Sequence, residues 1–374
     1  MTSMAVHFVA GVPYLLKGSV DGRVQVWDLA SGSMTTEEGT PDVMGPGGVV
    51  LGKTNIVNEL LMVTHPWFLA ATSVVPNTHA HMGNEVGCVQ MINLETFPKG
   101  PRVPFIRGKT SHISASLFSH THPVAKLVYV GDHSGTHFFV TGANDGILRY
   151  WKMVVGAAME VEATGVDHVG HIREVTDVIH LPPSSTGGAP EHRMWSASAD
   201  GTIIIWKLFQ PEPLHIIDPS SDGHTSMVNC LVAFDGPHAD SQVRRVVASG
   251  GADGMLKLWD ENALCFASFQ EGCPVRCLAV VKDRNGNTAL VAGLEDGNIA
   301  IRATNAGAGA NTYALLYRLP ASPRGSPVLR VLDIRGKNED GSDAVTGKFA
   351  TFSFRDNEVQ LFDTMNEYPL IAQP

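Results

Sequence analysis

The sequence predicts an all-β protein in which one hairpin unit recurs along 374 residues. The clearest copy is residues 246–260, VVASGGADGMLKLWD, where an apolar strand, an Asp-Gly turn and an alternating strand follow one another. Asp-Gly between two alternating apolar runs is a strong hairpin signal. Further copies lie at residues 15–28, 139–152 and 194–207, and weaker ones at 290–303 and 351–364. A hydrophobic content of 44% with 17% charged residues is typical of an ordered globular protein.

These repeats resemble those of the WD-repeat (WD40) family, whose fold is a β-propeller with four antiparallel strands, a to d, in each blade. The resemblance covers nearly the whole chain and implies a single seven-bladed WD40-type β-propeller. The largest step between successive b–c turns is about 65 residues, whereas a hidden blade would need about 80–90, at about 40–45 residues per repeat. The expected blades span about residues 4–50, 51–108, 109–165, 166–218, 219–270, 271–320 and 321–374.

The blades keep the repeat to different degrees. We expect strands a, b and c of blade 1 near residues 5–9, 14–18 and 24–28, and strands b and c of blade 2 near 68–74 and 88–94. Polar or Gly-rich segments predict insertions at 76–87 in blade 2, 119–137 in blade 3, 182–192 in blade 4 and 336–347 in blade 7. Strand a is expected at 275–281 in blade 6 and at 328–334 in blade 7. The last strand is expected from the C-terminal residues 368–372.

The resemblance also implies a buried tetrad in each well-kept blade: a His before strand a, a Ser or Thr in strand b, the turn Asp and the strand-c Trp. In such a set the Asp fixes the His tautomer and the hydroxyl accepts from the indole N–H, so no buried polar group is unpaired. The complete sets are His112, Thr141, Asp145, Trp151; His171, Ser196, Asp200, Trp206; and His224, Ser249, Asp253, Trp259. The incomplete ones are Ser19, Asp21 and Trp27 in blade 1, Asp296 with Arg302 in blade 6, and Asp356 with Phe362 in blade 7.

Ser, His and Asp are also the residue types of a hydrolytic triad. Here the trio repeats once per blade, and the serine lies within a strand, away from any nucleophile elbow or oxyanion hole. We therefore expect no catalytic residue and no enzyme activity.

Two groups of side chains could suggest a metal site. They are Cys265, Cys273 and Cys277, and the pairs His79/His81 and His120/His122. The cysteines match no standard zinc spacing and lie in apolar segments, so we expect buried structural thiols. No carboxylate or thiol is spaced to complete either histidine pair, which favours solvated loop histidines. No phosphate-binding loop is present either, so we expect neither a metal nor a cofactor.

The charge and the cysteine count restrict the classes of partner. A net charge of −10 argues against a general phosphate-binding surface, which needs clustered Lys and Arg. No apolar run of about 18 residues occurs, so we expect no membrane partner. The N-terminus has no basic segment and reads as the first hairpin rather than a signal peptide. The odd number of cysteines, five, indicates a reducing, intracellular location, either cytoplasmic or nuclear.

A finer resemblance is to the propeller half of plant-type proteins that join a CCCH zinc finger to WD repeats. It rests on Pro66, Trp67, Phe68 and Leu69 in blade 2, on Lys282, Asp283 and Gly286 in blade 6, and on VQLFD in blade 7. It implies an RNA-linked role, although this chain has no C-x8-C-x5-C-x3-H element. The locally basic stretch 99–109, KGPRVPFIRGK, is better explained as a solvated edge between blades 2 and 3 than as a contact for RNA or an acidic partner.

Two functions therefore remain open: a scaffold for protein–protein interactions in a multiprotein complex, and an RNA-associated subunit that binds mRNA directly or indirectly. In propellers of this family, the d–a and b–c loops open on the top face, where the residue before each turn Asp faces solvent. Those positions are Val20, Asn144, Ala199, Ala252, Glu295 and Arg355. An apolar centre with a charged edge suits a protein or peptide better than a phosphate backbone. The insertions at 76–87 and 182–192 are the alternative binding surfaces.

Overall fold

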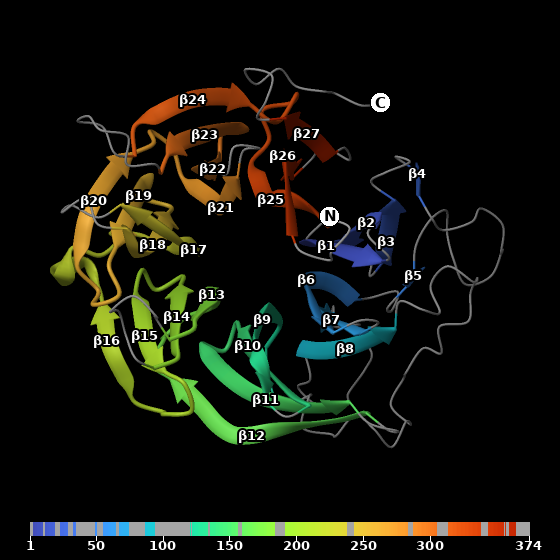
Figure 1. The fold of residues 1–374 in the computed structure, drawn as a ribbon. Coiled ribbons are helices and arrows are strands. Elements are labelled where there is room, and N and C mark those ends of the chain that lie inside the picture. The colour runs from blue at the N-terminus through green and yellow to red at the C-terminus, as the bar shows by residue number, and fades with distance from the viewer. Residues whose placement is uncertain are drawn as a thin grey trace. The chain divides into compact units, whose positions relative to one another are not determined.

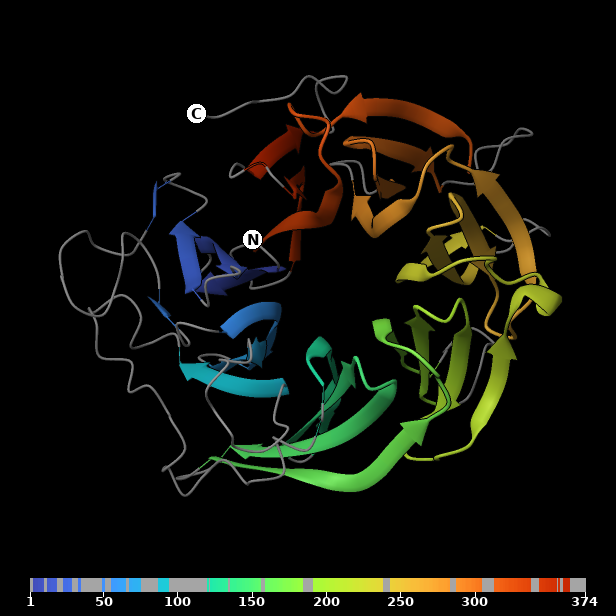
Figure 2. The same ribbon diagram turned by 180° about the vertical axis from the view of Figure 1, so that it is seen from behind.

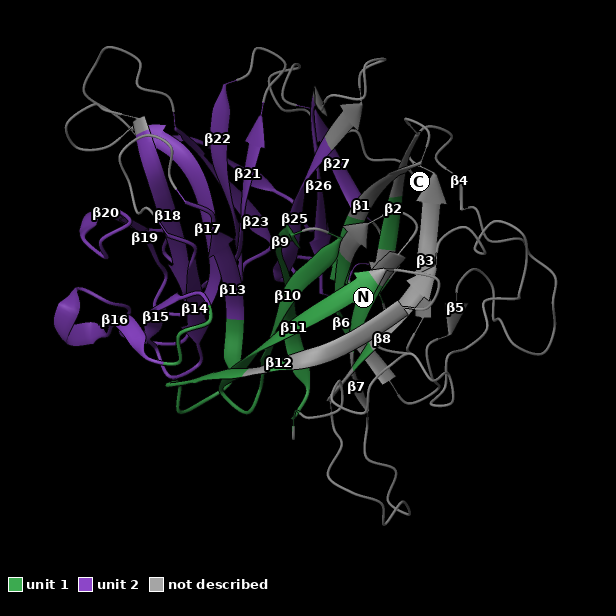
Figure 3. Ribbon diagram, turned by 60° about the horizontal axis from the view of Figure 1, so that its bottom comes forward, with its two compact units in different colours: residues 1–176, 209–211 green, residues 177–208, 212–374 purple. Residues whose placement is uncertain are grey.

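The structure is a computed structural model, and it describes the following part of the chain. The described residues are 3–9, 12–18, 23–28, 33–34, 49–50, 55–64, 67–74, 87–93, 120, 122–133, 135–155, 159–183, 191–237, 243–282, 287–304, 313–337, 343–354, 356 and 359–363. They contain strands and one short 3-10 helix, η3 (Pro219–Ser221), and no α-helix. The chain divides into two compact units: unit 1, residues 1–176 and 209–211, and unit 2, residues 177–208 and 212–374 (Figure 3).

Unit 1 contains three antiparallel sheets. The first joins β1 (Ser3–Val9), β2 (Val12–Gly18), β3 (Arg23–Asp28) and β4 (Ser33–Met34), with β5 (Val49–Val50) also paired to β3. The second joins β6 (Asn55–Thr64), β7 (Trp67–Val74) and β8 (Gly87–Asn93). The third joins β9 (Val124–His133), β10 (Thr136–Ala143), β11 (Ile147–Val155) and β12 (Met159–Val169).

Unit 2 carries four more sheets. They are β13 (Val175–Leu181), β14 (Arg193–Ser198), β15 (Ile203–Lys207) and β16 (Pro213–Ile217); β17 (Val228–Pro237), β18 (Val243–Gly251), β19 (Met255–Trp259) and β20 (Cys265–Gln270); β21 (Val275–Lys282), β22 (Thr288–Leu294), β23 (Asn298–Ala303) and β24 (Leu315–Pro320); and β25 (Val328–Lys337), β26 (Asp343–Ser353) and β27 (Val359–Asp363). The first strand β21 contacts both β17 and β25, and the last strands β16, β20 and β24 lie on the opposite side of this unit (Figures 1 and 2). The seven sheets confirm the predicted all-β, WD40-type propeller fold class.

The Asp-Gly turns form because glycine can adopt a left-handed backbone. Gly254 has φ 77°, and its N–H donates to the Gly251 carbonyl at 3.2 Å. The Asp253 carboxylate then accepts from the Met255 N–H at 3.0 Å, which starts the next strand. The corresponding glycines of the other blades share this conformation: Gly146, Gly201 and Gly297 have φ of 78°, 86° and 83°. A positive φ costs glycine nothing, which explains the recurring Asp-Gly pair.

Neighbouring sheets of unit 2 are joined by buried apolar packing and, at their first strands, by single polar bonds. Val246, Leu258 and Leu290 belong to one buried cluster that spans two sheets. The Asp177 carboxylate accepts from the Leu231 N–H at 2.8 Å, and the Asn229 side chain donates to the Val275 carbonyl at 2.7 Å. Each bond links two blades that are consecutive in the sequence.

Several sequence expectations were wrong in detail. The supposed insertion 119–137 contains β9 and the start of β10, because the largely apolar start of Val124–His133, VAKLVYV, forms a strand despite the surrounding histidines. Strand β12 runs to Val169, past the expected blade boundary at 165. The charged loop of blade 7 is shorter than expected, since β25 extends to Lys337 and β26 begins at Asp343. The expected last strand, 368–372, lies outside the described residues, as does most of the insertion 76–87.

Candidate functional site

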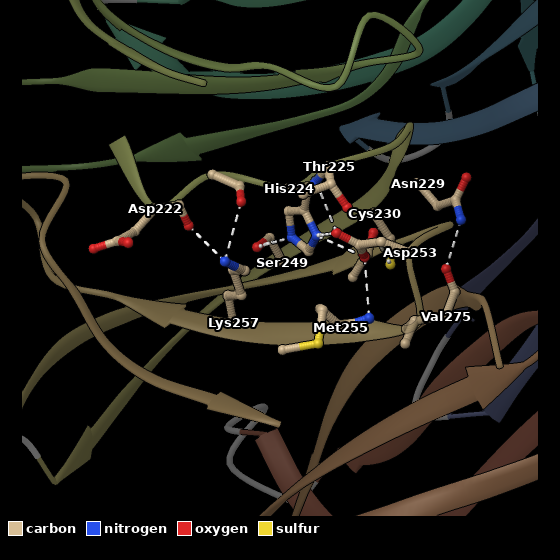
Figure 4. Close-up of polar contacts among 12 residues, drawn as sticks. Asp222, His224, Thr225, Asn229, Cys230, Ser249, Asp253, Met255, Lys257 and Val275 are labelled. Atoms are coloured by element: carbon tan, nitrogen blue, oxygen red, sulfur yellow. Dashed lines mark hydrogen bonds and ion pairs between the residues drawn. The ribbon is translucent and has the colours of Figure 1, made fainter. Parts of the chain in front are cut away.

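The best-formed polar set lies in blade 5 (Figure 4). His224 precedes β17 and bridges two elements: its Nδ1 lies 3.0 Å from the Asp253 carboxylate, and its Nε2 lies 2.8 Å from Ser249 Oγ. The Trp259 Nε1–H donates to the same Ser249 Oγ at 2.8 Å. The backbone N–H groups of Thr225 and Met255 also donate to Asp253, each at 3.0 Å. These bonds join the turn, strands β18 and β19, and the segment before the blade.

The electrostatics of this set favour a neutral histidine beside an ionised aspartate. Burial lowers the pKa of His224, and this outweighs the opposing influence of Asp253. Burial by itself would raise the pKa of Asp253, but hydrogen bonds from Met255 and His224 outweigh it and hold that pKa below its usual value. A neutral His224 then donates from Nδ1 to Asp253 and accepts at Nε2 from Ser249. The serine hydroxyl is fully used, so it is not available as a nucleophile.

Blade 3 has the same arrangement with a different histidine. His120 Nδ1 lies 3.0 Å from the Asp145 carboxylate and His120 Nε2 lies 2.7 Å from Thr141 Oγ1, while the Trp151 Nε1–H donates to that hydroxyl at 2.9 Å. The sequence expectation assigned this place to His112, which lies outside the described residues, and treated His120 as a solvated loop residue. His120 is buried and precedes its first strand by four residues, as His224 does. Recognition of β9 in the sequence would have identified it.

In blade 4 the indole of Trp206 donates to Ser196 Oγ at 2.8 Å, and Asp200 accepts from the Thr202 N–H at 2.9 Å. His171, the fourth expected member, belongs to unit 1, whereas the other three belong to unit 2. In blade 1, Ser19 and Asp21 lie outside the described residues.

Blade 6 replaces the tetrad with a buried ion pair. Glu271 stands four residues before β21, the place of the histidine, and Arg302 stands at the place of the tryptophan on β23. The Arg302 guanidinium donates to the Glu271 carboxylate from Nε and Nη2, both at 2.8 Å. It also donates to the Tyr313 carbonyl at 3.1 Å and lies 4.2 Å from the centre of the Phe269 ring. The sequence showed the loss of Trp but not the partner of Arg302.

The b–c turns of each unit pack against the segments that precede the following blade. In unit 1, a Cβ at Gly146 would lie only 2.7 Å from the His171 carbonyl oxygen and 3.0 Å from that of Arg173. In unit 2, the Gly254 turn similarly approaches the Cys273 carbonyl, and the Gly297 turn approaches Gly325. The two loop types therefore share one surface in each unit. We name it the turn face, formed by Asn144 and Ile172 in unit 1 and by Ala199, Ala252, Glu295, Arg324 and Phe354 in unit 2.

The expected binding positions on the turn face are only partly open to solvent. Asn144, Ala199, Ala252 and Glu295 are all half-buried. Glu295 forms an ion pair with Arg276 of its own blade. Val20 and Arg355 lie outside the described residues.

The most exposed side chains of the turn face were missed by the sequence reasoning. Ile172 is 87% exposed and Phe354 is 58% exposed, while the Arg324 guanidinium lies 4.0 Å from Asp356 and remains largely in solvent. Ile172 directly follows the His that precedes a blade, so its position in the d–a segment was the available signal.

The candidate metal ligands do not gather into a site. Among the described residues, no group of three or more His, Cys, Asp or Glu side chains could hold a metal ion. Cys277 is buried, whereas Cys265 and Cys273 are only half-buried, which corrects the expectation of three buried thiols. His122 is exposed, and His79 and His81 lie outside the described residues. No helix in the described parts of the chain has the length and apolar character needed to cross a membrane.

Comparisons with known proteins agree with this geometry. Residues 212–260, which include the blade-5 hairpin, match the family described as WD domain, G-beta repeat. Nuclear distribution protein PAC1-2 of Uncinocarpus reesii is 26% identical over 172 residues, 41% of this chain and 34% of that protein. Nuclear distribution protein PAC1 of Komagataella phaffii is 37% identical over 73 residues, 18% of this chain and 14% of that protein. The chain thus matches about a third of one relative and about a seventh of the other.

A chain in a crystal structure of the mitotic checkpoint complex superposes with a TM-score of 0.58 at 16% identity. The match covers 92% of this chain and 85% of that one, and at this identity it shows the fold alone. The family match, the recurring turn and the polar sets behind it have one common explanation. The chain carries a WD40 repeat at residues 212–260 and has the fold class of the WD-repeat β-propellers.

Proposed function

We propose that this protein is a non-enzymatic scaffold that binds protein partners through its turn face, as part of a multiprotein complex. The observation that carries the proposal is Ile172, a large aliphatic side chain that is 87% exposed on a turn held against Gly146. A rigidly presented apolar side chain beside charged neighbours is typical of an interface anchor. Arg173 and Glu174, which follow it, supply such charges at partly exposed positions.

Two further observations support the scaffold. The Ser, His and Asp groups of blade 5 are consumed by hydrogen bonds to one another and to Trp259, which leaves no free nucleophile in that set. The matched relatives are nuclear distribution proteins, and the structural neighbour comes from a checkpoint complex. The cysteines with described side chains, at 230, 265, 273 and 277, are free thiols, which agrees with the proposed intracellular location.

The test is purification of the full-length protein and its partners from its native cell, with and without Ile172→Asp. The expected result is loss of at least one protein partner with an unchanged melting temperature, because an exposed aspartate costs the free protein little. Leu264→Asp is the matched control, since Leu264 is 63% exposed on the turn between β19 and β20. Equal loss with the control, or no loss with Ile172→Asp, would contradict the proposal. Partners removed by ribonuclease in the wild-type purification would instead support the RNA-associated alternative, which stays a prediction.

A further inference from the structure

Blade 7 has the strand register of blade 5 but different polar residues. Val228 pairs with Gly251 and Val247 with Trp259 in blade 5, and the corresponding pairs in blade 7 are Val328–Ser353 and Phe349–Phe362. This register places Thr351 where blade 5 has Ser249, Phe362 where it has Trp259, and Ser353 where it has Gly251.

The substitutions remove both partners of the central hydroxyl. Phe362 has no N–H and stacks on Phe349, with ring centres 4.8 Å apart. Instead of an imidazole, Ser322 Oγ donates to the Asp356 carboxylate at 2.5 Å and accepts from the Ser326 N–H at 2.8 Å.

Two buried hydroxyls of this blade consequently have no partner among the described residues. They are Thr351 Oγ1 and Ser353 Oγ, on side chains that are 0% and 2% exposed. Leaving a buried hydroxyl without a hydrogen bond destabilises the folded state, so two such groups in one blade call for a partner.

Blade 5 shows what normally occupies this place. A Cβ added at Gly251 would clash with the His224 ring and with the Asp253 carboxylate. The side chain of Ser353 is therefore directed into the space that the imidazole fills in blade 5. Thr351 lies two residues earlier on the same strand face, because side chains alternate along a strand. Arg324 stands four residues before β25, at the place of His224, but its side chain is 74% exposed and so does not fill the space of the imidazole. This leaves room between the two hydroxyls and the Ser322–Asp356 pair.

We propose that blade 7 binds a buried water molecule where blade 5 holds the Nε2 of its histidine. The water hydrogen-bonds Thr351 Oγ1 and Ser353 Oγ and extends the network of Ser322 and Asp356. Buried waters take two to four such partners, and water can both donate and accept, which suits hydroxyl groups. Water fits better than a metal ion because the single carboxylate, Asp356, already accepts from Ser322.

The first test is a crystal structure of the full chain at a resolution that shows ordered solvent. We expect an isolated density peak about 2.6–3.2 Å from Thr351 Oγ1 and within reach of Ser353 Oγ. Empty space, or a protein atom from residues 355–358 in hydrogen-bonding contact with Thr351, would overturn the proposal. This measurement needs no variant and so does not depend on how a substitution folds.

The second test uses the sign of a stability change. Thr351→Val keeps the shape and removes the hydroxyl; if a water is bound there, the variant loses a hydrogen bond and the melting temperature falls by about 1–3 °C. If the hydroxyl is truly unpaired, the same variant melts higher, which would overturn the proposal. Thr141→Val is the matched control, since Thr141 has two protein partners and its loss must lower the melting temperature. Ser353→Ala should produce a smaller fall than Thr351→Val.

Discussion

Removal of one member of the buried ion pair in blade 6 should destabilise the protein strongly. The side chains of Arg302 and Glu271 are only 8% and 2% exposed, so solvent cannot compensate a lost partner. Arg302→Met removes two hydrogen bonds to the Glu271 carboxylate and a third to the Tyr313 carbonyl, each charge-assisted and worth about 1.5–3 kcal/mol. It also leaves the carboxylate buried without its cation. Deletion of one partner of a buried pair typically costs about 3–5 kcal/mol, and we expect that loss here.

Removal of both charges should have a different effect on stability. Glu271→Leu combined with Arg302→Met buries apolar groups of similar size, and such replacements are often neutral or stabilising. The double variant should therefore recover most of the stability lost by Arg302→Met. This recovery separates an unpaired buried charge from simple loss of packing.

The assay is urea unfolding followed by circular dichroism, with free energies compared for the wild type, both single variants and the double variant. Arg245→Met is the matched control, because its partner Asp235 is 67% exposed and regains water; its cost should be about 1 kcal/mol or less. A loss below about 1 kcal/mol for Arg302→Met would refute the reasoning. So would a double variant as unstable as the sum of the two single ones.

Three further predictions follow from the polar sets and the turn face. Asp253→Ala removes the acceptor of three hydrogen bonds and should cost about 1–3 kcal/mol, measured by urea unfolding; an unchanged midpoint would show that the set does not stabilise blade 5. Burial lowers the pKa of His168 to about 4, so the unfolded state binds more protons between about pH 4 and 6.5 and stability should fall as pH decreases across that window. His168→Gln should reduce the dependence of the melting temperature on pH across that window. An unchanged dependence would contradict the lowered pKa of His168. Glu295→Lys combined with Arg355→Glu should remove a partner in affinity purification without unfolding the protein, whereas an unchanged partner set would favour the side insertions.

The b–c hairpins could be predicted because their determinants are local. Asp and Gly fix a turn whose glycine has a positive φ, and antiparallel pairing then sets the spacing of every residue behind it. The hydroxyl and the indole of a tetrad are ten residues apart in blade 3, in blade 4 and in blade 5. A constant register of this kind is readable from the sequence, and the predicted Ser–Trp and Thr–Trp pairs are the ones that hydrogen-bond.

The residue before each blade that hydrogen-bonds to the hairpin could not be identified from a local pattern. His120 and Asp145 are 25 residues apart, His224 and Asp253 are 29 apart, and Glu271 reaches Arg302 across 31. These separations depend on the lengths of strand a and of the loop after it, which no local pattern fixes. The exposure of the Ile172 side chain likewise depends on which distant segments pack around it, so no local pattern predicts it. The sequence alone determines the repeated hairpins and their turns, because those interactions close within about ten residues. Only the tertiary structure decides which residue of the preceding segment completes each polar set and which side chains stay exposed, because both depend on where distant segments meet.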